Sequence, residues 1–393
     1  MKVCFETFGC RLNRAEALEQ EAEFAARGWI RTDGHADADL IVVRGCSVTQ
    51  RAQRDCERLI EHIRGKYPFK RLVVTGCLSD KTKAFTIKKR GDGEPVPVPT
   101  RTSRAYLKVQ DGCTGKCTFC IVPKFRGAPV SVDFGEVIDK AKRFVDAGYR
   151  EIVVTGCNLS LYESGGKRLS ELVAALSEIA PASLGEGKSC RVRLGSVEPS
   201  AVVSDVLDVM AERENVCRFL HIPIQSGSSR ILALMGRPYS ARDIDTMVHN
   251  ARQRVKGIAL GCDFMTGFPG ESDIDFLATK GLLTRARFER VHVFTYSERP
   301  GTPASAMPGS VPLDIRRDWA RELVRQADKI RSAAAREFEG KTVEIVVEDE
   351  KNGAGWTSEY FWCSCQNLHT LRKSLARVKV RTVDGHMLSG EPA

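Results

Sequence analysis

Apolar and polar positions along the first hundred residues alternate between short apolar runs and amphipathic stretches with helical spacing. The expected elements are strands at 2–8, 39–44 and 71–75 and helices at 14–27 and 49–67. A strand that is repeatedly followed by a helix favours a parallel sheet with helices on its faces. We therefore expect a small parallel α/β domain over residues 1–100.

A second series of the same kind follows a stretch rich in proline and glycine, "GDGEPVPVPTRTSR", which is typical of an extended linker. Helical patterns separate six further strand patterns. These lie at 105–110, 151–156, 191–196, 219–224, 259–267 and 290–297. Six such units predict a partial (β/α)6 barrel over residues 101–335, with its chemistry at the carboxyl ends of the strands.

The tail of the chain changes character after a helical pattern at 313–337. Short strand patterns at 341–350, 355–363 and 375–391 are broken by turns and predict a small β-barrel over residues 338–393. Its aromatic residues could stack on bases or fill its core, and the sequence leaves both readings open. They are Trp356, Tyr360, Phe361 and Trp362. The expected fold class is α/β with this C-terminal barrel attached.

Composition favours a cytoplasmic protein with nucleic acid as a possible partner. No apolar run is long enough for a membrane span, and the N-terminus lacks the basic start and apolar stretch of a secretory signal. In the cytoplasm the 14 cysteines would stay reduced and available to metal. The formal net charge is +10, and Arg51–Arg90 holds 12 basic against four acidic residues. Such a cluster fits either a solvated helix face or a nucleic-acid footprint.

Each strand of the first series ends in Gly-Cys. The cysteines are Cys10, Cys46 and Cys77. Because the carboxyl ends of parallel strands meet at one edge of a sheet, these three thiols should converge. Burial as small hydrophobic residues is the alternative, although the threefold repeat argues against it.

Three more cysteines, Cys113, Cys117 and Cys120, lie in one loop directly after the strand at 105–110. A structural zinc site requires four ligands, and disulfides require pairs in an oxidising compartment. Three thiolates can instead hold a [4Fe-4S] cluster through three irons, which leaves the fourth iron open to a small chelating molecule.

The C-x3-C-x2-C spacing with Phe119 resembles the radical S-adenosylmethionine (SAM) superfamily. Longer stretches resemble its methylthiotransferases over nearly the whole chain. They are "TFGCRLNRAE", "LKVQDGCTGKCTFCIVPKFRG", "HIPIQSGSSRILALMGRPYS" and "DFMTGFPGES". The resemblance implies that one [4Fe-4S] cluster is held by Cys113, Cys117 and Cys120 and cleaves SAM to a 5'-deoxyadenosyl radical. It also implies an auxiliary [4Fe-4S] cluster on Cys10, Cys46 and Cys77, and a C-terminal TRAM domain that grips RNA.

Residues at the barrel mouth are expected to hold SAM, with an ordinary loop contact as the alternative for each polar residue. Three of them follow predicted strands, one lies in "MGRPYS", one in the turn "GFPG" and one in the cysteine loop. They are Asn158, Glu198 and Gln225, then Arg237, Phe268 and Phe119.

Within the family, "GCRLNRAE", "EIVVTGCNLSLY" and "LGSVEP" resemble most the branch that modifies threonylcarbamoyladenosine (t6A) at tRNA position 37. The resemblance implies 2-methylthiolation of that base in the anticodon stem-loop, with sulfur from the auxiliary cluster and methyl from another SAM. Implied partners are an electron donor such as flavodoxin or ferredoxin and a sulfur source, and the expected state is a monomer. The alternatives are methylthiolation of isopentenyladenosine in tRNA or of a ribosomal-protein aspartate, or a non-catalytic RNA-binding relative. The interval from Cys77 to Cys113 is short for the family, which implies a shortened N-terminal domain.

Overall fold

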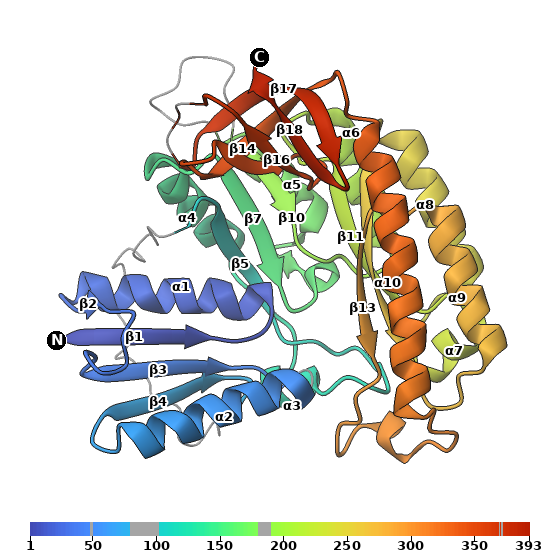
Figure 1. The fold of residues 1–393 in the computed structure, drawn as a ribbon, viewed down its shortest axis with the longest axis horizontal. Helices are drawn as coiled ribbons and strands as arrows, with labels where there is room; N and C mark the ends of the chain where they lie inside the picture. Colours follow the sequence, from blue (N-terminus) through green and yellow to red (C-terminus); the bar gives the residue numbers. More distant parts are fainter. Residues whose placement is uncertain (48–49, 79–101, 180–189, 369, 371) are drawn as a thin grey trace.

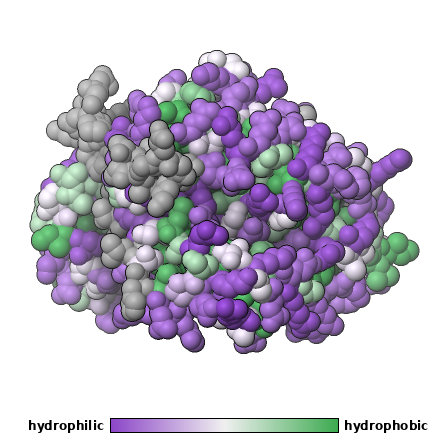
Figure 2. Space-filling view, turned by 90° about the horizontal axis from the view of Figure 1, so that it is seen from above, coloured by the Kyte–Doolittle hydropathy of each residue, from purple (hydrophilic) through white to green (hydrophobic). Residues whose placement is uncertain are grey.

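The computed structural model describes residues 1–47, 50–78, 102–179, 190–368, 370 and 372–393. An N-terminal sheet, a central barrel and a C-terminal barrel follow one another along the chain (Figure 1). The expected linker and the second half of the basic stretch fall largely outside the described residues. No helix among the described residues combines the length and apolar character that crossing a bilayer requires. Figure 2 shows a largely hydrophilic face.

The N-terminal sheet has four parallel strands in the order β2-β1-β3-β4. They are β1 (Lys2–Thr7), β2 (Ile30–Arg31), β3 (Leu40–Gly45) and β4 (Arg71–Gly76). Helices α1 (Arg11–Ala26) and α2 (Gln50–Lys66) cover its opposite faces (Figure 1). The α2 side buries Ile60 and Ile63 against Ile41 and Val43 of β3. The predicted parallel sheet is confirmed, and only the two-residue β2 is additional.

The central unit is the predicted partial barrel of six parallel strands. They are β5 (Ala105–Asp111), β7 (Glu151–Gly156), β10 (Arg191–Leu194), β11 (Phe219–Gln225), β12 (Ala259–Thr266) and β13 (Arg290–Thr295). The strands fall into two sheets, one with β5, β7 and β10 and the other with β11, β12 and β13. Isolated bridges, such as that between Ser196 and His221, connect the β10 side to the β11 side. The short β6 (Val130–Ser131) pairs antiparallel at the β5 edge.

Helices surround this barrel on the outside (Figure 1). They are α4 (Phe134–Asp146), α5 (Leu169–Ser177), α6 (Ala201–Glu212), α7 (Ser229–Leu234), α8 (Ala241–Arg254), α9 (Asp273–Ala286) and α10 (Leu313–Arg336). The short α3 (Val122–Arg126) instead belongs to the connection that follows β5. Side chains alternate across each strand, so one set packs under the helices while the other lines the barrel interior. On the open side, Ala15 and Leu18 of α1 pack against Tyr106 of β5 and Val153 of β7.

The tail forms a closed barrel in the order β14-β15-β16-β18-β17, as the turn-broken pattern predicted. Its strands are β14 (Thr342–Asp349), β15 (Ala354–Thr357), β16 (Trp362–Cys365), β17 (Leu375–Asp384) and β18 (Met387–Pro392). Phe361, Cys363 and Cys365 fill its core, whereas Trp356 and Tyr360 belong to an aromatic group with Phe219 of the central barrel.

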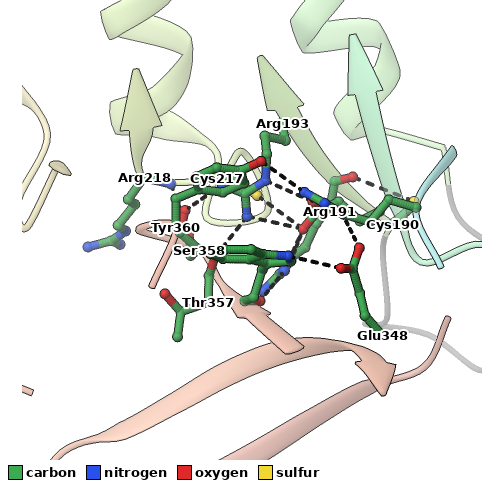
Figure 3. Close-up of polar contacts among 12 residues, drawn as sticks. Cys190, Arg191, Arg193, Cys217, Arg218, Glu348, Thr357, Ser358 and Tyr360 are labelled. Atoms are coloured by element: carbon green, nitrogen blue, oxygen red, sulfur yellow. Dashed lines mark hydrogen bonds and ion pairs between the residues drawn. The ribbon is translucent and has the colours of Figure 1, made fainter. Parts of the chain in front are cut away.

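A buried ion-pair network docks the C-terminal barrel against the central one (Figure 3). Glu151, which has no exposed surface, accepts bonds from Arg191 at 3.1 Å and from Arg193 at 2.8 Å. The same guanidinium groups donate to the carbonyl oxygens of Trp356 and Thr357 at 3.0 and 2.8 Å. Each arginine therefore joins a carboxylate of one unit to the backbone of the other.

Replacing Glu151 with glutamine is expected to lower the free energy of unfolding by about 3–5 kcal/mol, because buried guanidinium groups then lack their counter-charge. The urea midpoint of the variant measures this loss. Glu178→Gln breaks the exposed pair with Arg213 and is the matched control, with an expected change below about 1 kcal/mol. Equal effects of the two changes would contradict a buried network.

Tyr360 is the point where all three units meet. Its hydroxyl accepts from Arg11 of α1 and from Arg104, each at 3.3 Å. The guanidinium groups of Arg193 and Arg290 lie over its ring, 4.5 and 4.2 Å from the centroid.

The arginines around Tyr360 predict an unusually low pKa for its hydroxyl. Burial opposes ionisation of Tyr360, but Arg11, Arg104 and Arg193 outweigh it and lower the pKa to about 8. Because the folded pKa lies below the unfolded value of about 10, ionisation adds stability as pH rises between these values. Ultraviolet titration should show a phenolate forming near pH 8 that is missing in Tyr360→Phe. A titration that is identical in both proteins would contradict the assignment.

Candidate functional site

The first cysteine triplet lies in the loop that leaves the carboxyl end of β5. Gly112 has φ +71°, and a side chain there would collide with the Ala128 carbonyl oxygen at 2.0 Å. A Cβ atom on Gly115 would lie 3.2 Å from the Cys113 sulfur and 3.7 Å from the Cys117 sulfur. The two glycines therefore allow a tight loop in which these two sulfurs face the same small volume.

Three of the residues expected to hold SAM surround these sulfurs. Arg237 donates to the Cys117 sulfur at 3.2 Å and pairs with Glu198 at 3.0 Å. The Asn158 side chain lies 3.8 Å from the Cys113 sulfur. Asn158 follows β7 and Glu198 follows β10, so the barrel topology brings them to the cysteine loop, as predicted for side chains at strand ends.

The aromatic residues also gather here, whereas Gln225 does not join the group. Phe119 packs edge-on against Phe268 with 6.4 Å between ring centroids. Gln225 ends β11 with φ +76°. Its amide lies 3.5 Å from the carbonyl oxygen of Pro223 in its own strand. Among the described residues it forms no hydrogen bond with the cysteine loop.

Three thiolates are a suitable donor set for a [4Fe-4S] cluster with one open iron, and their sulfurs are not placed for a single tetrahedral ion. A tetrahedral zinc ion would hold its sulfur ligands about 3.8 Å apart. In the described part of the chain, the sulfurs of Cys113, Cys117 and Cys120 do not gather within 4.8 Å of one another as a set. Burial raises the pKa of the Cys120 thiol to about 11, so a metal group would displace protons on binding. The guanidinium of Arg237 offsets the negative charge that then appears.

The second triplet lies at the carboxyl ends of three neighbouring strands. Cys10 follows β1, Cys46 follows β3 and Cys77 follows β4. Cys46 and Cys77 are buried, while Cys10 is exposed at the start of α1. A Cβ atom on Gly9, which has φ +97°, would lie 2.6 Å from the Cys46 sulfur. Glycine before each cysteine thus lets the strand ends approach, and the expected convergence is found.

Asn13 and Arg126 connect the two cysteine-bearing loops. The buried Asn13 amide donates to the carbonyl oxygens of Phe8 and Gly45, both at 2.9 Å, and so braces the ends of β1 and β3. Arg126 donates to the Asn13 side chain at 2.9 Å and to Asp111, at the end of β5, at 2.9 Å. It joins the N-terminal sheet to the strand that leads into the first triplet.

Sequence reasoning missed Arg126. It also pairs with Glu16 of α1 at 3.0 Å, and it opposes the burial that raises the pKa of the Cys77 thiol. The available signal was its position in "PKFRG", six residues after Cys120. The motif was recognised, but a lone arginine there gives no indication of partners that lie far away in the sequence.

Comparisons with known proteins agree with this arrangement. The profile of the Radical SAM superfamily matches residues 107–283, and that of the Uncharacterized protein family UPF0004 matches residues 2–94. The solved structure of the radical S-adenosylmethionine methyltransferase TsrM from Kitasatospora setae has a TM-score of 0.55 at 14% identity and covers 77% of each chain. At that identity the likeness supports the fold alone.

Relatives of similar length extend the comparison to the whole chain. The tRNA-2-methylthio-N(6)-dimethylallyladenosine synthase of Aquifex aeolicus is 30% identical over 99% of this chain and 98% of its own length. The threonylcarbamoyladenosine tRNA methylthiotransferase MtaB of Bacillus subtilis is 29% identical over 96% of this chain and 93% of its own. The chain therefore belongs to the radical SAM methylthiotransferase family and is an enzyme that transfers a methylthio group, with [4Fe-4S] clusters and S-adenosylmethionine as its cofactors.

Proposed function

We propose that this enzyme methylthiolates carbon 2 of t6A at position 37 in the anticodon stem-loop of tRNA. The observation that carries the proposal is the joining of the two cysteine triplets by Asn13, Arg126 and Asp111. A site that cleaves SAM and a site that carries sulfur then serve one substrate. The motifs "GCRLNRAE" and "LGSVEP" support the t6A branch, as do the names of relatives from Bacillus subtilis and Thermotoga maritima.

The residues have distinct tasks in this proposal. Cys113, Cys117 and Cys120 hold one cluster, and Cys10, Cys46 and Cys77 hold the other. Asn158, Glu198 and Arg237 orient SAM by their polar groups, and Phe119 and Phe268 provide an apolar wall. The hydrogen on carbon 2 of adenine is too weakly acidic for a side-chain base at neutral pH. The bound cofactors supply the radical chemistry that removes it, and the protein orients the reactants.

The proposal extends to partners. An electron donor such as flavodoxin or ferredoxin would reduce the site, and a sulfur source would restore the sulfur that each turnover consumes. The net charge of +10 favours association with a polyanion such as tRNA. We expect the enzyme to act as a monomer.

Dimethylallyladenosine is the second candidate substrate, because the Aquifex aeolicus relative carries that name at 30% identity. Both substrates are N6-substituted adenosines, so the same removal of hydrogen from carbon 2 would serve either. The difference lies in the N6 group: one carries a carboxylate and a hydroxyl, and the other is apolar.

Nucleoside mass spectrometry tests the choice. The chain is expressed in a bacterial host that lacks both modifications but makes both precursor nucleosides, and its tRNA is digested and analysed. We expect 2-methylthio-t6A to appear and the dimethylallyl nucleoside to stay unchanged. Methylthiolation of only the dimethylallyl nucleoside would reject the t6A assignment, and an inactive Cys117→Ala chain is the control for host background.

A further inference from the structure

The strands β12 and β13 present a polar and aromatic stripe to the barrel interior. Cys262 and Phe264 of β12 pack toward the outer helices, so Asp263 and Met265 between them face inward. On β13, Val291 and Val293 pack outward, which leaves Arg290, His292 and Phe294 on the inner side. Phe294 is 43% exposed, an unusual state for a phenylalanine inside a barrel.

Asp263 lies between two histidines in this stripe. Its Oδ1 atom is 3.0 Å from Nε2 of His221 and 3.1 Å from Nδ1 of His292. Burial disfavours the carboxylate, but bonds from both rings outweigh it and hold the pKa of Asp263 well below its usual range. The carboxylate is therefore ionised at neutral pH, and both rings donate to it.

This assignment determines which ring nitrogen is left free. His221 is buried, and its Nδ1 has no partner among the described residues, so it is the unprotonated nitrogen of a neutral ring. A metal ion on Nε2 of His221 would require a buried Nδ1–H without an acceptor, whereas metal-bound histidines normally donate that hydrogen. His292 gives its Nδ1–H to Asp263, which leaves Nε2 of this partly exposed ring open to a ligand.

Along β13, Phe294 lies between His292, with its open Nε2, and the SAM side of the barrel. It pairs in register with Met265, which packs in the same apolar cluster as Phe119 and Phe268. Phe294 is also two residues nearer than His292 to the carboxyl end of β13, the end where the cysteine loop lies. The rings of Phe294 and His292 meet edge to face, with 6.4 Å between their centroids.

We propose that Phe294 and His292 bind the nucleoside that is modified. Phe294 stacks on its base, Nε2 of His292 accepts a hydrogen bond from an N–H or O–H of the same nucleoside, and Asp263 positions the His292 ring. The inference rests on the proposed function, since it takes an RNA nucleoside as the substrate. An aromatic face tolerates any base, so the hydrogen bond adds the selectivity.

The test uses the reconstituted enzyme with an anticodon stem-loop RNA. Phe294→Ala should raise KM for the RNA by roughly 5- to 150-fold, the range expected for loss of one stacked base. Phe294→Tyr keeps an aromatic ring and should have a KM close to that of the parent enzyme. His292→Phe and Asp263→Asn should increase the ratio of 5'-deoxyadenosine to methylthio product, because SAM is still cleaved while the base is poorly held. SAM cleavage without RNA should match that of the parent enzyme.

The matched controls are Leu277→Ala, an exposed apolar residue on α9, and His249→Asn, an exposed histidine on α8. Neither should change KM or the product ratio. Unchanged KM and product ratio in Phe294→Ala and His292→Phe, with an active parent enzyme, would overturn the inference. If the parent methylthiolates a nucleoside other than t6A, the proposed substrate fails, and the same variants measured on that nucleoside still decide whether this stripe binds it.

Discussion

Replacing Cys117 with alanine is expected to reduce cleavage of SAM to the level measured without enzyme. Cys117 is one of three thiols in the loop after β5, and Arg237 donates to its sulfur at 3.2 Å. Two remaining thiols cannot hold a cube by three irons, so the open iron on which SAM cleavage depends is lost. Release of 5'-deoxyadenosine after chemical reduction, measured by chromatography, checks this result.

The matched control is Cys190→Ala, which removes a buried thiol from the core of the same barrel. This variant should keep both cleavage and the cluster absorbance, with at most a loss of stability. Substantial release of 5'-deoxyadenosine by Cys117→Ala would show that this loop does not hold the cluster that cleaves SAM.

Replacing Cys46 with alanine should leave SAM cleavage intact, unlike Cys117→Ala, but no methylthio nucleoside should form. Alanine keeps the Cβ atom that packs against Gly9, so the change removes the sulfur with little effect on the sheet. If each triplet holds one [4Fe-4S] cluster, iron content should fall from about eight to about four per chain. Iron analysis and nucleoside mass spectrometry on the same sample measure both effects.

Cys4→Ala in β1 controls for the general loss of a buried thiol from this sheet. It should retain the iron content and the product of the parent enzyme. Loss of SAM cleavage in Cys46→Ala would show that the two triplets do not act separately.

The strands and helices could be predicted because their patterns are local. The β3 and β4 runs, for example, are continuously apolar because both faces of the sheet are covered, and Gly45 and Gly76 lie directly opposite in the observed register. The convergence of Cys10, Cys46 and Cys77 followed from a general property of parallel sheets, and no tertiary contact was needed to infer it.

The partners of single polar residues could not be predicted, because tertiary contacts determine them. Arg126 contacts Asn13, 113 residues away, and Asp263 contacts histidines from two other strands. Nothing in the local sequence around Asp263 indicates these partners, and only the pairing of β11, β12 and β13 reveals its position. Gln225 had the same sequence evidence as Asn158, yet its amide stays with its own strand.

The position of Arg11 limits how this enzyme can be recombined with its relatives. Arg11 follows Cys10 directly in the chain and donates to Tyr360, which belongs to the last 56 residues. A chimera that exchanges the C-terminal barrel for one without a tyrosine at this position would lose an acceptor shared by Arg11 and Arg104. Because α1 begins at Arg11, exchanging the C-terminal barrel to change the RNA preference would also disturb the backbone next to Cys10.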